Sequence, residues 1–355
     1  MEGCSDIIYP GDLDDYMYSW PSWFFVVIFV PLVASFGVFS NCAFIFAVYR
    51  VRIMRSITNM YLVNLAIADS CLLIAALSQY IGDYIVSPDY DLRFSFHTTF
   101  GCSVPNFLIY LCYYASLWTV TLVSLERYLA ICHTFWHRLI STKKRALRMI
   151  AVVWLIALVF SGFAAPYTPI TLCLKSSASN DSLIVRQIPY CEFSCQSCAG
   201  ILYITDLIQF FFAMTSNITM YTLIIYKLGK TEFPTGDESS TVESRRAQQT
   251  RNAVARMLII NGVLFFICLT PFSIANLESI CKLFDISIFS QVFVNHLGWI
   301  GRVLFLVNST LNPLVYSASN RRYRMAFRQA FGFRTETGVN SSTFSATKTC
   351  TTSQL

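Results

Sequence analysis

An acid and an arginine stand side by side in the segment SLERYLAICH, at the end of a long apolar run. Arg127 alone would be expected to extend its side chain to the lipid headgroups. Glu126, directly before it, points to a second role, because a charge pair at the mouth of a helical bundle can act as a latch whose breaking opens a cavity. The pair therefore favours a switch over a simple headgroup contact.

Other polar residues interrupt the apolar runs, where an unpaired polar group costs free energy. Asp69 allows two interpretations. Its carboxylate is either satisfied by neighbouring hydroxyls and amides or binds a monovalent cation, since hard cations prefer oxygen ligands. The residues that share this position inside apolar runs are Asn41, Asp69, Ser116, Thr119, Asn308, Ser309 and Asn312.

Two further charges lie inside apolar runs, toward the membrane face opposite to Arg127. Arg302 precedes Asn312 by ten residues, about 15 Å along a helix, and Asp206 lies in the fifth run. Arg302 either pairs with Glu278 or Asp285, or forms the cationic end of a pocket whose anionic end is Asp206. A guanidinium suits a carboxylate or a C-terminal amide, and aromatic walls with few polar anchors suit a short peptide. The other predicted wall residues are Gln79, Tyr110, Tyr113, Phe272, Asn276 and Trp299.

Membrane-spanning helices must position these residues. The chain of 355 residues is 55% hydrophobic and 13% charged, with a mean hydropathy of +0.53. Its apolar blocks have about the 20 to 25 residues of a helix that crosses a bilayer. The expected fold is an all-α membrane protein, a seven-transmembrane helix bundle. The predicted spans are roughly 22–49, 58–86, 99–132, 147–168, 199–228, 253–281 and 291–317.

The charge distribution predicts the orientation of this bundle. A net charge of +6 could indicate nucleic acid, but residues 1–20 hold five acids and no Lys or Arg, whereas basic residues gather in the first, third and fifth gaps and after the last span. Cytoplasmic loops carry such an excess. We expect a multi-pass protein of the plasma membrane with an extracellular N-terminus and no nucleic-acid partner.

The chain divides into four regions. An extracellular N-terminus of residues 1–21 precedes the seven-helix domain of residues 22–317. Residues 318–331 include NRRYRMAFRQAF, which predicts a short amphipathic eighth helix on the inner leaflet. Residues 332–355 are rich in Ser and Thr and predict a disordered cytoplasmic tail.

Catalytic sequence motifs are missing, so we expect no enzymatic activity. The inverted repeat of many secondary transporters is missing as well, which leaves a seven-span transporter as the weaker alternative. Most of the 13 cysteines lie inside spans as small apolar residues. Cys102 lies at the outer face, and a disulfide from it to Cys191, Cys195 or Cys198 is plausible on sidedness. Asn180 heads an NDS sequon and is a candidate for glycosylation.

Taken together, these residues resemble the rhodopsin-like (class A) G-protein-coupled receptors. Any single match is weak, but the full set in order and at the family's spacing is specific. The resemblance implies a cell-surface receptor that binds an extracellular ligand and activates a heterotrimeric G protein. The matching positions are Asn41, LAIAD at 65–69, Cys102, ERY at 126–128, Trp154, Tyr221, Pro271 and NPLVY at 312–316.

The resemblance also implies roles. Arg127 is expected to pair with Glu126 at rest and to meet the G protein on activation, and Phe135 is expected to dock into the G protein. A disulfide is expected between Cys102 and the outer loop, with Cys191 as the first choice. The implied sodium pocket, the only cofactor expected, is formed by Asp69, Ser116, Asn308, Ser309 and Asn312. The implied activation switch consists of Glu126, Arg127, Tyr128, Tyr221, Phe265, Leu269, Pro271, Asn312, Pro313 and Tyr316.

Three positions depart from the family pattern. Ala213 replaces the proline of the fifth span, and Leu269 replaces the tryptophan two residues before Pro271. Arg251 stands where the family has an acid that holds Arg127 at rest. Because two cations cannot form a latch, we expect a resting state that is held less tightly.

The absence of two residue types from the expected pocket positions excludes two classes of ligand, retinal and amines. Span seven has no lysine for retinal, with Leu306 in its place, and Ile109 stands where amine receptors have an aspartate. The segments TNMYLVNLAIAD and SLERYLAICH are most similar to neuropeptide receptors of the thyrotropin-releasing-hormone, neuromedin and ghrelin kind. This resemblance implies a short neuropeptide ligand and a q-class G protein, with a lipid or other small molecule as the alternative ligand.

The tail adds expected cytoplasmic partners. Phosphorylation of its many Ser and Thr residues would add close to two negative charges per site, which in this family recruits arrestin. The terminal TSQL ends in a free carboxylate that could add as a strand to a PDZ domain. Membrane lipids surround the bundle in any case.

Overall fold

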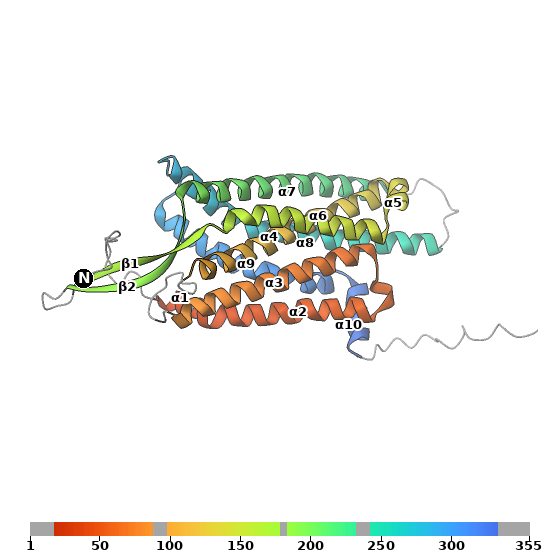
Figure 1. Ribbon diagram of the computed structural model, residues 1–355. Helices are drawn as coiled ribbons and strands as arrows, with labels where there is room; N and C mark the ends of the chain where they lie inside the picture. Colours follow the sequence, from red (N-terminus) through yellow and green to blue (C-terminus); the bar gives the residue numbers. More distant parts are fainter. Residues whose placement is uncertain (1–17, 87, 89–97, 178–182, 232–241, 333–355) are drawn as a thin grey trace, which may run out of the picture.

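The computed structural model describes residues 18–86, 88, 98–177, 183–231 and 242–332. Long helices lie side by side as a bundle, with a two-stranded hairpin at one end and a short helix across the other (Figure 1). The first rod consists of α1 (Trp20–Phe24), the π-helical segment η2 (Phe25–Phe29) and α2 (Val30–Arg50). Ser19 caps it by accepting from the Ser22 amide.

The remaining rods follow in order. They are α3 (Ile57–Val86), α4 (Thr99–Cys132), α6 (Lys143–Ser161), α7 (Gln196–Thr231), α8 (Val242–Leu283) and α9 (Gln291–Ser319). Shorter helical segments connect them: η3 (Arg52–Met54), α5 (Thr134–Ile140) and η4 (Gly162–Ala164). With the first rod, these form the seven-transmembrane bundle expected from the sequence.

Six of the rods are apolar enough over a membrane's thickness to span it on composition alone. The seventh rod, α9, has 29 residues, and its polar residues lower its hydropathy. The polar residues in its second half are buried against other helices rather than facing lipid, among them Asn308, Ser309 and Asn312. The polar groups that weaken the hydropathy signal of α9 therefore form its packing face.

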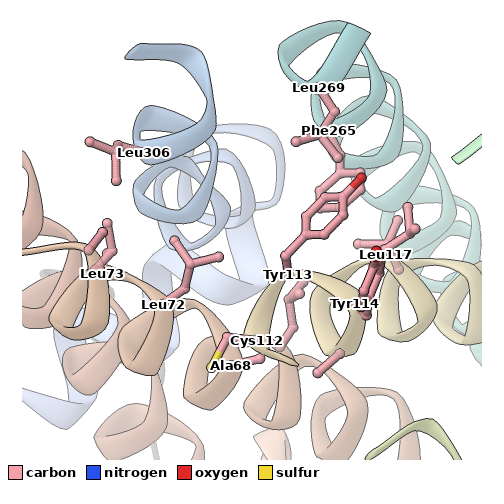
Figure 2. Packing of buried hydrophobic residues seen from close by; sticks show 14 of the residues in the cluster. Ala68, Leu72, Leu73, Cys112, Tyr113, Tyr114, Leu117, Phe265, Leu269 and Leu306 are labelled. Carbon is pink, nitrogen blue, oxygen red and sulfur yellow. The ribbon is translucent and has the colours of Figure 1, made fainter. Parts of the chain in front are cut away.

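Helix α4 is the centre of the bundle. It contacts α3, α6, α7 and α8, and its inward face buries Tyr114, Leu117 and Ser124 among many others. One apolar cluster fills the outer half of the bundle, where Tyr113, Phe265 and Leu269 converge (Figure 2). A second cluster fills the inner half around Phe44, Met54 and Tyr316.

The second outer loop is a β-hairpin, which the sequence analysis did not predict. Strands β1 (Tyr167–Ser177) and β2 (Leu183–Phe193) are antiparallel, with Tyr167 opposite Phe193. The fourth span ends with η4 at Ala164, and its predicted end at residue 168 was wrong. β-branched and aromatic residues in the loop favour the strands.

Two disulfides are present among the described residues. Cys102 is bonded to Cys191, which ties the hairpin to the outer end of α4. Cys195 is bonded to Cys198 across the start of α7, a pairing that the sequence analysis did not predict. The structure does not describe Asn180, residues 1–17 of the acidic leader, residues 232–241 of the fifth gap or residues 333–355 of the Ser/Thr tail.

The short helix α10 (Arg321–Ala330) follows α9 directly. Asn320 caps it by accepting from the Arg322 amide. Tyr323, Ala326 and Ala330 are buried against α2 and α9, whereas the arginines occupy the rest of its surface. This is the amphipathic arrangement that places a helix along a membrane surface.

Candidate ligand cavity and signalling site

A cavity of about 140 Å³ opens between α3, α4, α8 and α9 in the outer half of the bundle. Five of the eight predicted pocket residues line it: Gln79, Tyr110, Tyr113, Phe272 and Arg302. Its walls are aromatic and aliphatic, with a few polar groups, which is the composition of many small-ligand sites.

Trp299 supports this cavity from behind. The Arg302 guanidinium lies 4.4 Å from the centre of the Trp299 ring, a cation–π contact. The same indole meets Phe25 edge-on, with 5.2 Å between ring centres. Trp299 thus orients Arg302 without lining the cavity itself.

Asp206 does not form the anionic end of the cavity, contrary to the prediction. It is fully buried between α7 and α8, where Asn276 donates to its carboxylate over 2.7 Å and Tyr113 lies against it. The rotation of a helix about its own axis is set by packing against its neighbours, so the sequence alone could not decide which way Asp206 faces. Asp206 and Asn276 therefore hold Tyr113 in position from the side that faces away from the cavity.

Asp83 is the acid that lines the cavity, and the sequence analysis missed it. It lies on α3 four residues after Gln79, on the same helical face, and is nearly fully buried. The four-residue spacing from Gln79, a predicted pocket residue, could have identified Asp83 as a second one. The cavity therefore carries an acid and a base, Asp83 and Arg302, on different helices.

Glu278, the first of the acids that could have paired with Arg302, has other partners. It accepts from the Ser287 hydroxyl and from the Ile288 amide, each over 3.2 Å. These bonds tie the outer end of α8 to the following turn. Asp285 lies in that turn, with a φ of 57°.

The predicted sodium-site residues converge in the middle of the bundle. The Asp69 carboxylate accepts from Ser116 over 2.9 Å and from Asn312, and Ser309 lies beside it. Asn41 holds the backbone of α9 there by donating to the Ser309 carbonyl, and Asn308 is buried nearby. A monovalent cation prefers carboxylate, hydroxyl and amide oxygens as ligands. The residues gathered around Asp69 therefore fit a sodium ion.

Trp154 belongs to a neighbouring network. Its indole donates to Asn64, which donates to Thr119, each over 2.8 Å. This chain joins α6, α3 and α4.

Glu126 is not paired with Arg127, contrary to the prediction. Its carboxylate accepts from His137 over 2.7 Å and from Ser141 over 3.3 Å, which follow it in the loop that contains α5. Adjacent residues leave a helix about 100° apart, so their side chains can reach different partners. The sequence neighbours therefore turn to different partners.

Arg127 is next to Tyr323 of α10 and to Arg251 of α8 as well as to Glu126. Its Nε has no hydrogen-bond partner among the described residues. Arg251 donates to the Ala130 carbonyl over 3.4 Å, so this position supplies a second cation beside Arg127 instead of an acid. Burial raises the pKa of Tyr323 to about 12, and Arg127 opposes that shift.

The tyrosines of the predicted switch have separate partners. Tyr221 bonds with Ser124 over 2.8 Å, and its hydroxyl occupies the space that a Cβ at Gly262 of α8 would need. Tyr316 packs between Phe44 and Tyr323.

The other predicted switch residues lie as follows. Tyr128 bonds with His133 over 3.0 Å at the inner end of α4. Phe265 and Leu269 lie on α8 beside Tyr113 (Figure 2). Pro271 and Pro313 stand inside α8 and α9, and Ala213 lies in α7 with Asn217 bonded back to its carbonyl.

Phe135 is 71% exposed on α5, beside Trp136, which is 62% exposed. Exposed aromatic side chains in a loop are typical of an interaction site rather than of packing. Phe135 is on the same face of the bundle as Arg127.

The fold and these sites define a seven-helix membrane receptor with an outer cavity and an inner arginine. The sequence profile of the 7 transmembrane receptor (rhodopsin family) matches residues 40–316, and the chain belongs to this family. It is a multi-pass protein of the plasma membrane that couples to G proteins.

Several receptors are similar along most of the chain. Neuromedin-U receptor 2 of Mus musculus is 30% identical over 85% of this chain and 74% of its own length. The allatostatin-A receptor of Bombyx mori is 28% identical over 86% of this chain and 78% of its own length. The thyrotropin-releasing hormone receptor of Gallus gallus is 26% identical over 85% of this chain and 77% of its own length.

Proposed function

We propose that the chain is a cell-surface receptor for a short extracellular peptide and that its function is signalling rather than catalysis. The observation that carries this proposal is the outer cavity, which places Arg302 and Asp83 among the rings of Tyr110, Tyr113 and Phe272. The relatives are by name receptors for neuromedin U, allatostatin A and thyrotropin-releasing hormone, which supports a peptide ligand.

Asp83 and Arg302 suit a ligand with two different ends. Arg302 would bind a C-terminal amide or carboxylate through its planar guanidinium. Asp83 would bind a cationic or hydrogen-bond-donating group of the same ligand. Tyr110, Tyr113 and Phe272 supply apolar area between these two anchors, and Asp206 with Asn276 holds Tyr113 in place.

The signal would pass from this cavity to the inner face through α8, which carries Phe272 above and Arg251 below. We assign the N-terminus to the outside from the charge pattern, and Arg127 and Phe135 to the G-protein contact. A q-class G protein is the first choice. A sodium ion at Asp69, a glycan at Asn180, arrestin at the phosphorylated tail and a PDZ domain at the C-terminus belong to the same proposal.

The test is affinity selection from a library of short amidated peptides on the receptor in nanodiscs. Arg302→Gln should abolish retention of the peptides that the unmodified receptor selects, and Asp83→Asn should weaken the retention of basic ones. Lys282→Gln removes an outer charge that is bonded to Gln291 outside the cavity and should change nothing. Selection unaffected by Arg302→Gln would contradict the peptide proposal and favour a neutral lipid or small molecule.

A further inference from the structure

A disulfide between close neighbours in the sequence lies at the outer start of α7. In the segment CQSC, Cys195 and Cys198 are bonded to each other with two residues between them. The same C-x-x-C spacing occurs in proteins whose disulfides open and close during function. The outer ligand cavity and the inner signalling site do not use this bridge, so its chemistry is separate from theirs.

This bridge differs from the other disulfide in exposure and in the loop that it closes. Cys102 and Cys191 are buried and lie 89 residues apart, whereas Cys195 is exposed, Cys198 is half-buried and they lie 3 apart. The stabilisation from a disulfide grows with the length of the closed loop, and exposed disulfides are more open to attack by thiols. The short bridge can therefore open while the long bridge keeps the receptor folded.

Cys195 caps the first turn of α7. Its carbonyl accepts from the amides of Cys198 and Ala199, over 3.1 and 3.4 Å. Its Sγ also accepts from the Cys198 amide, over 3.0 Å, as the side chain of a helix-capping residue does. The N-terminal end of a helix favours negative charge, so a thiolate at Cys195 would be stabilised by contacts that are already in place.

Cys198 lines a cavity of about 310 Å³ between η4 and the start of α7. Ser194 holds the two sides of this cavity together, because its amide and hydroxyl both donate to the Pro166 carbonyl, over 2.8 and 3.0 Å. One water molecule needs only about 10 to 15 Å³ of such space, so the cavity has room for the carbon skeleton of a small thiol. The described lining is Gly162, Phe163, Ala165, Pro166, Cys198 and Ile201.

The two sulfur atoms therefore suit different parts in thiol–disulfide exchange. The rate of exchange depends on access to the attacked sulfur and on how well the departing sulfur carries negative charge. The cavity gives a small thiol space beside Cys198, and the helix cap stabilises the charge on Cys195. This arrangement favours attack at Cys198 and departure of Cys195.

We propose that Cys195 and Cys198 form a reversible modification site for low-molecular-weight thiols. The thiolate of a small thiol attacks Cys198 Sγ and forms a mixed disulfide, while the proton of that thiol passes to water. The Cys195–Cys198 bond breaks, and its electron pair leaves with Cys195 as a thiolate. Attack by the Cys195 thiolate on Cys198 Sγ expels the small thiol and restores the bridge.

A second thiol completes the reduction. It attacks the sulfur of the bound small thiol, releases Cys198 as a thiolate and leaves as the disulfide of the two small thiols. Two electrons pass to the bridge, and two thiols are oxidised. Because no step involves the outer ligand, the proposal stands or falls independently of the peptide.

Peptide mapping by tandem mass spectrometry tests the proposal on the receptor in nanodiscs. Existing thiols are blocked with N-ethylmaleimide, 2-mercaptoethanol is added in increasing amounts, and newly formed thiols are trapped with deuterated N-ethylmaleimide. We expect the 2-mercaptoethanol adduct on Cys198 and the deuterated label on Cys195, at concentrations that leave Cys102–Cys191 fully bonded. An adduct on Cys195 with the label on Cys198, or opening of both bridges at the same concentration, would overturn the proposal.

Two matched variants test the cavity. Ile201→Trp fills it without touching either cysteine and should lose most of the Cys198 adduct. Ile204→Trp adds the same side chain one turn later, at an exposed position of α7 outside the cavity, and should keep the adduct. Equal amounts of adduct in the two variants would contradict the role of the cavity.

A third variant tests Cys198 without the bridge. Cys195→Ser retains a side chain that can cap α7 and leaves Cys198 as a thiol beside the cavity. Incubation with 2-hydroxyethyl disulfide should then place the same adduct on Cys198. A Cys198 thiol that stays unmodified in this folded variant would show that the cavity does not admit a small thiol, against the proposal.

Discussion

His137 should set the basal activity of this receptor. In the structure it is the closest donor to the Glu126 carboxylate, at 2.7 Å, and Ser141 at 3.3 Å is the second. Glu126 is only 4% exposed, and a buried carboxyl group that loses its hydrogen-bond partners costs free energy. A carboxylate only accepts, so His137 Nε2 carries the proton in this bond.

The substitution His137→Ala removes that donor and leaves Glu126 close to Arg127, the cation of its own helix. A hydrogen bond to a charged group contributes about 1.5 to 3 kcal/mol. An arrangement in which Glu126 pairs with Arg127 would gain about that much relative to the observed one. Since about 1.4 kcal/mol corresponds to tenfold in an equilibrium constant, we expect basal activity to fall roughly tenfold or more.

The assay is agonist-independent nucleotide exchange on a purified G protein by the receptor in nanodiscs. His133→Ala is the matched control, because His133 bonds to Tyr128 in the same loop and not to Glu126. It should leave basal exchange unchanged. Basal exchange that stays equal or rises in His137→Ala would refute the argument that His137 keeps Glu126 away from Arg127.

Three further outcomes are expected. Tyr323→Phe removes a buried 2.6 Å bond to Asn59 and should destabilise the receptor by about 1 to 3 kcal/mol, seen as a lower melting temperature; an unchanged melting curve would contradict this. Asp69→Asn should abolish the difference in thermal stability between sodium and choline chloride, whereas a retained difference would place the cation elsewhere. Cys191→Ser opens a bridge between residues 89 apart and Cys195→Ser one between residues 3 apart, so the first should reduce surface expression more, with losses of about 4–5 against about 2 kcal/mol.

The sequence predicted most of the architecture because each spanning helix corresponds to one contiguous apolar run of residues. The boundaries held where a polar or charged residue ended the run, as at Arg50 and His133. They failed after Ala164, where β1 follows from Tyr167 and continues the apolar residues as a strand. Apolar periodicity cannot separate a short strand from the last turns of a helix.

Side-chain partners were harder to predict than helices. The conflict at Glu126 arose because neighbours in sequence need not be neighbours on a helix, and its partner, His137, lies eleven residues away. Asp83 faces the outer cavity and Asp206 does not, because packing sets the rotation of α3 and α7 about their axes. The cluster at Asp69 was anticipated as a set because the family resemblance, and not the spacing, brought those residues together.

The central claim is that a peptide bound near Arg302 opens the opposite end of the bundle, so that Arg127 can contact a G protein. The most direct measurement is peptide-stimulated nucleotide exchange on a purified G protein, with the unmodified receptor and Arg127→Ala compared in nanodiscs against the same library of amidated peptides. We predict that some peptides stimulate exchange on the unmodified receptor, and that Arg127→Ala still binds them without stimulating exchange. Full stimulation by Arg127→Ala, or a library that binds without raising exchange on the unmodified receptor, would contradict the claim.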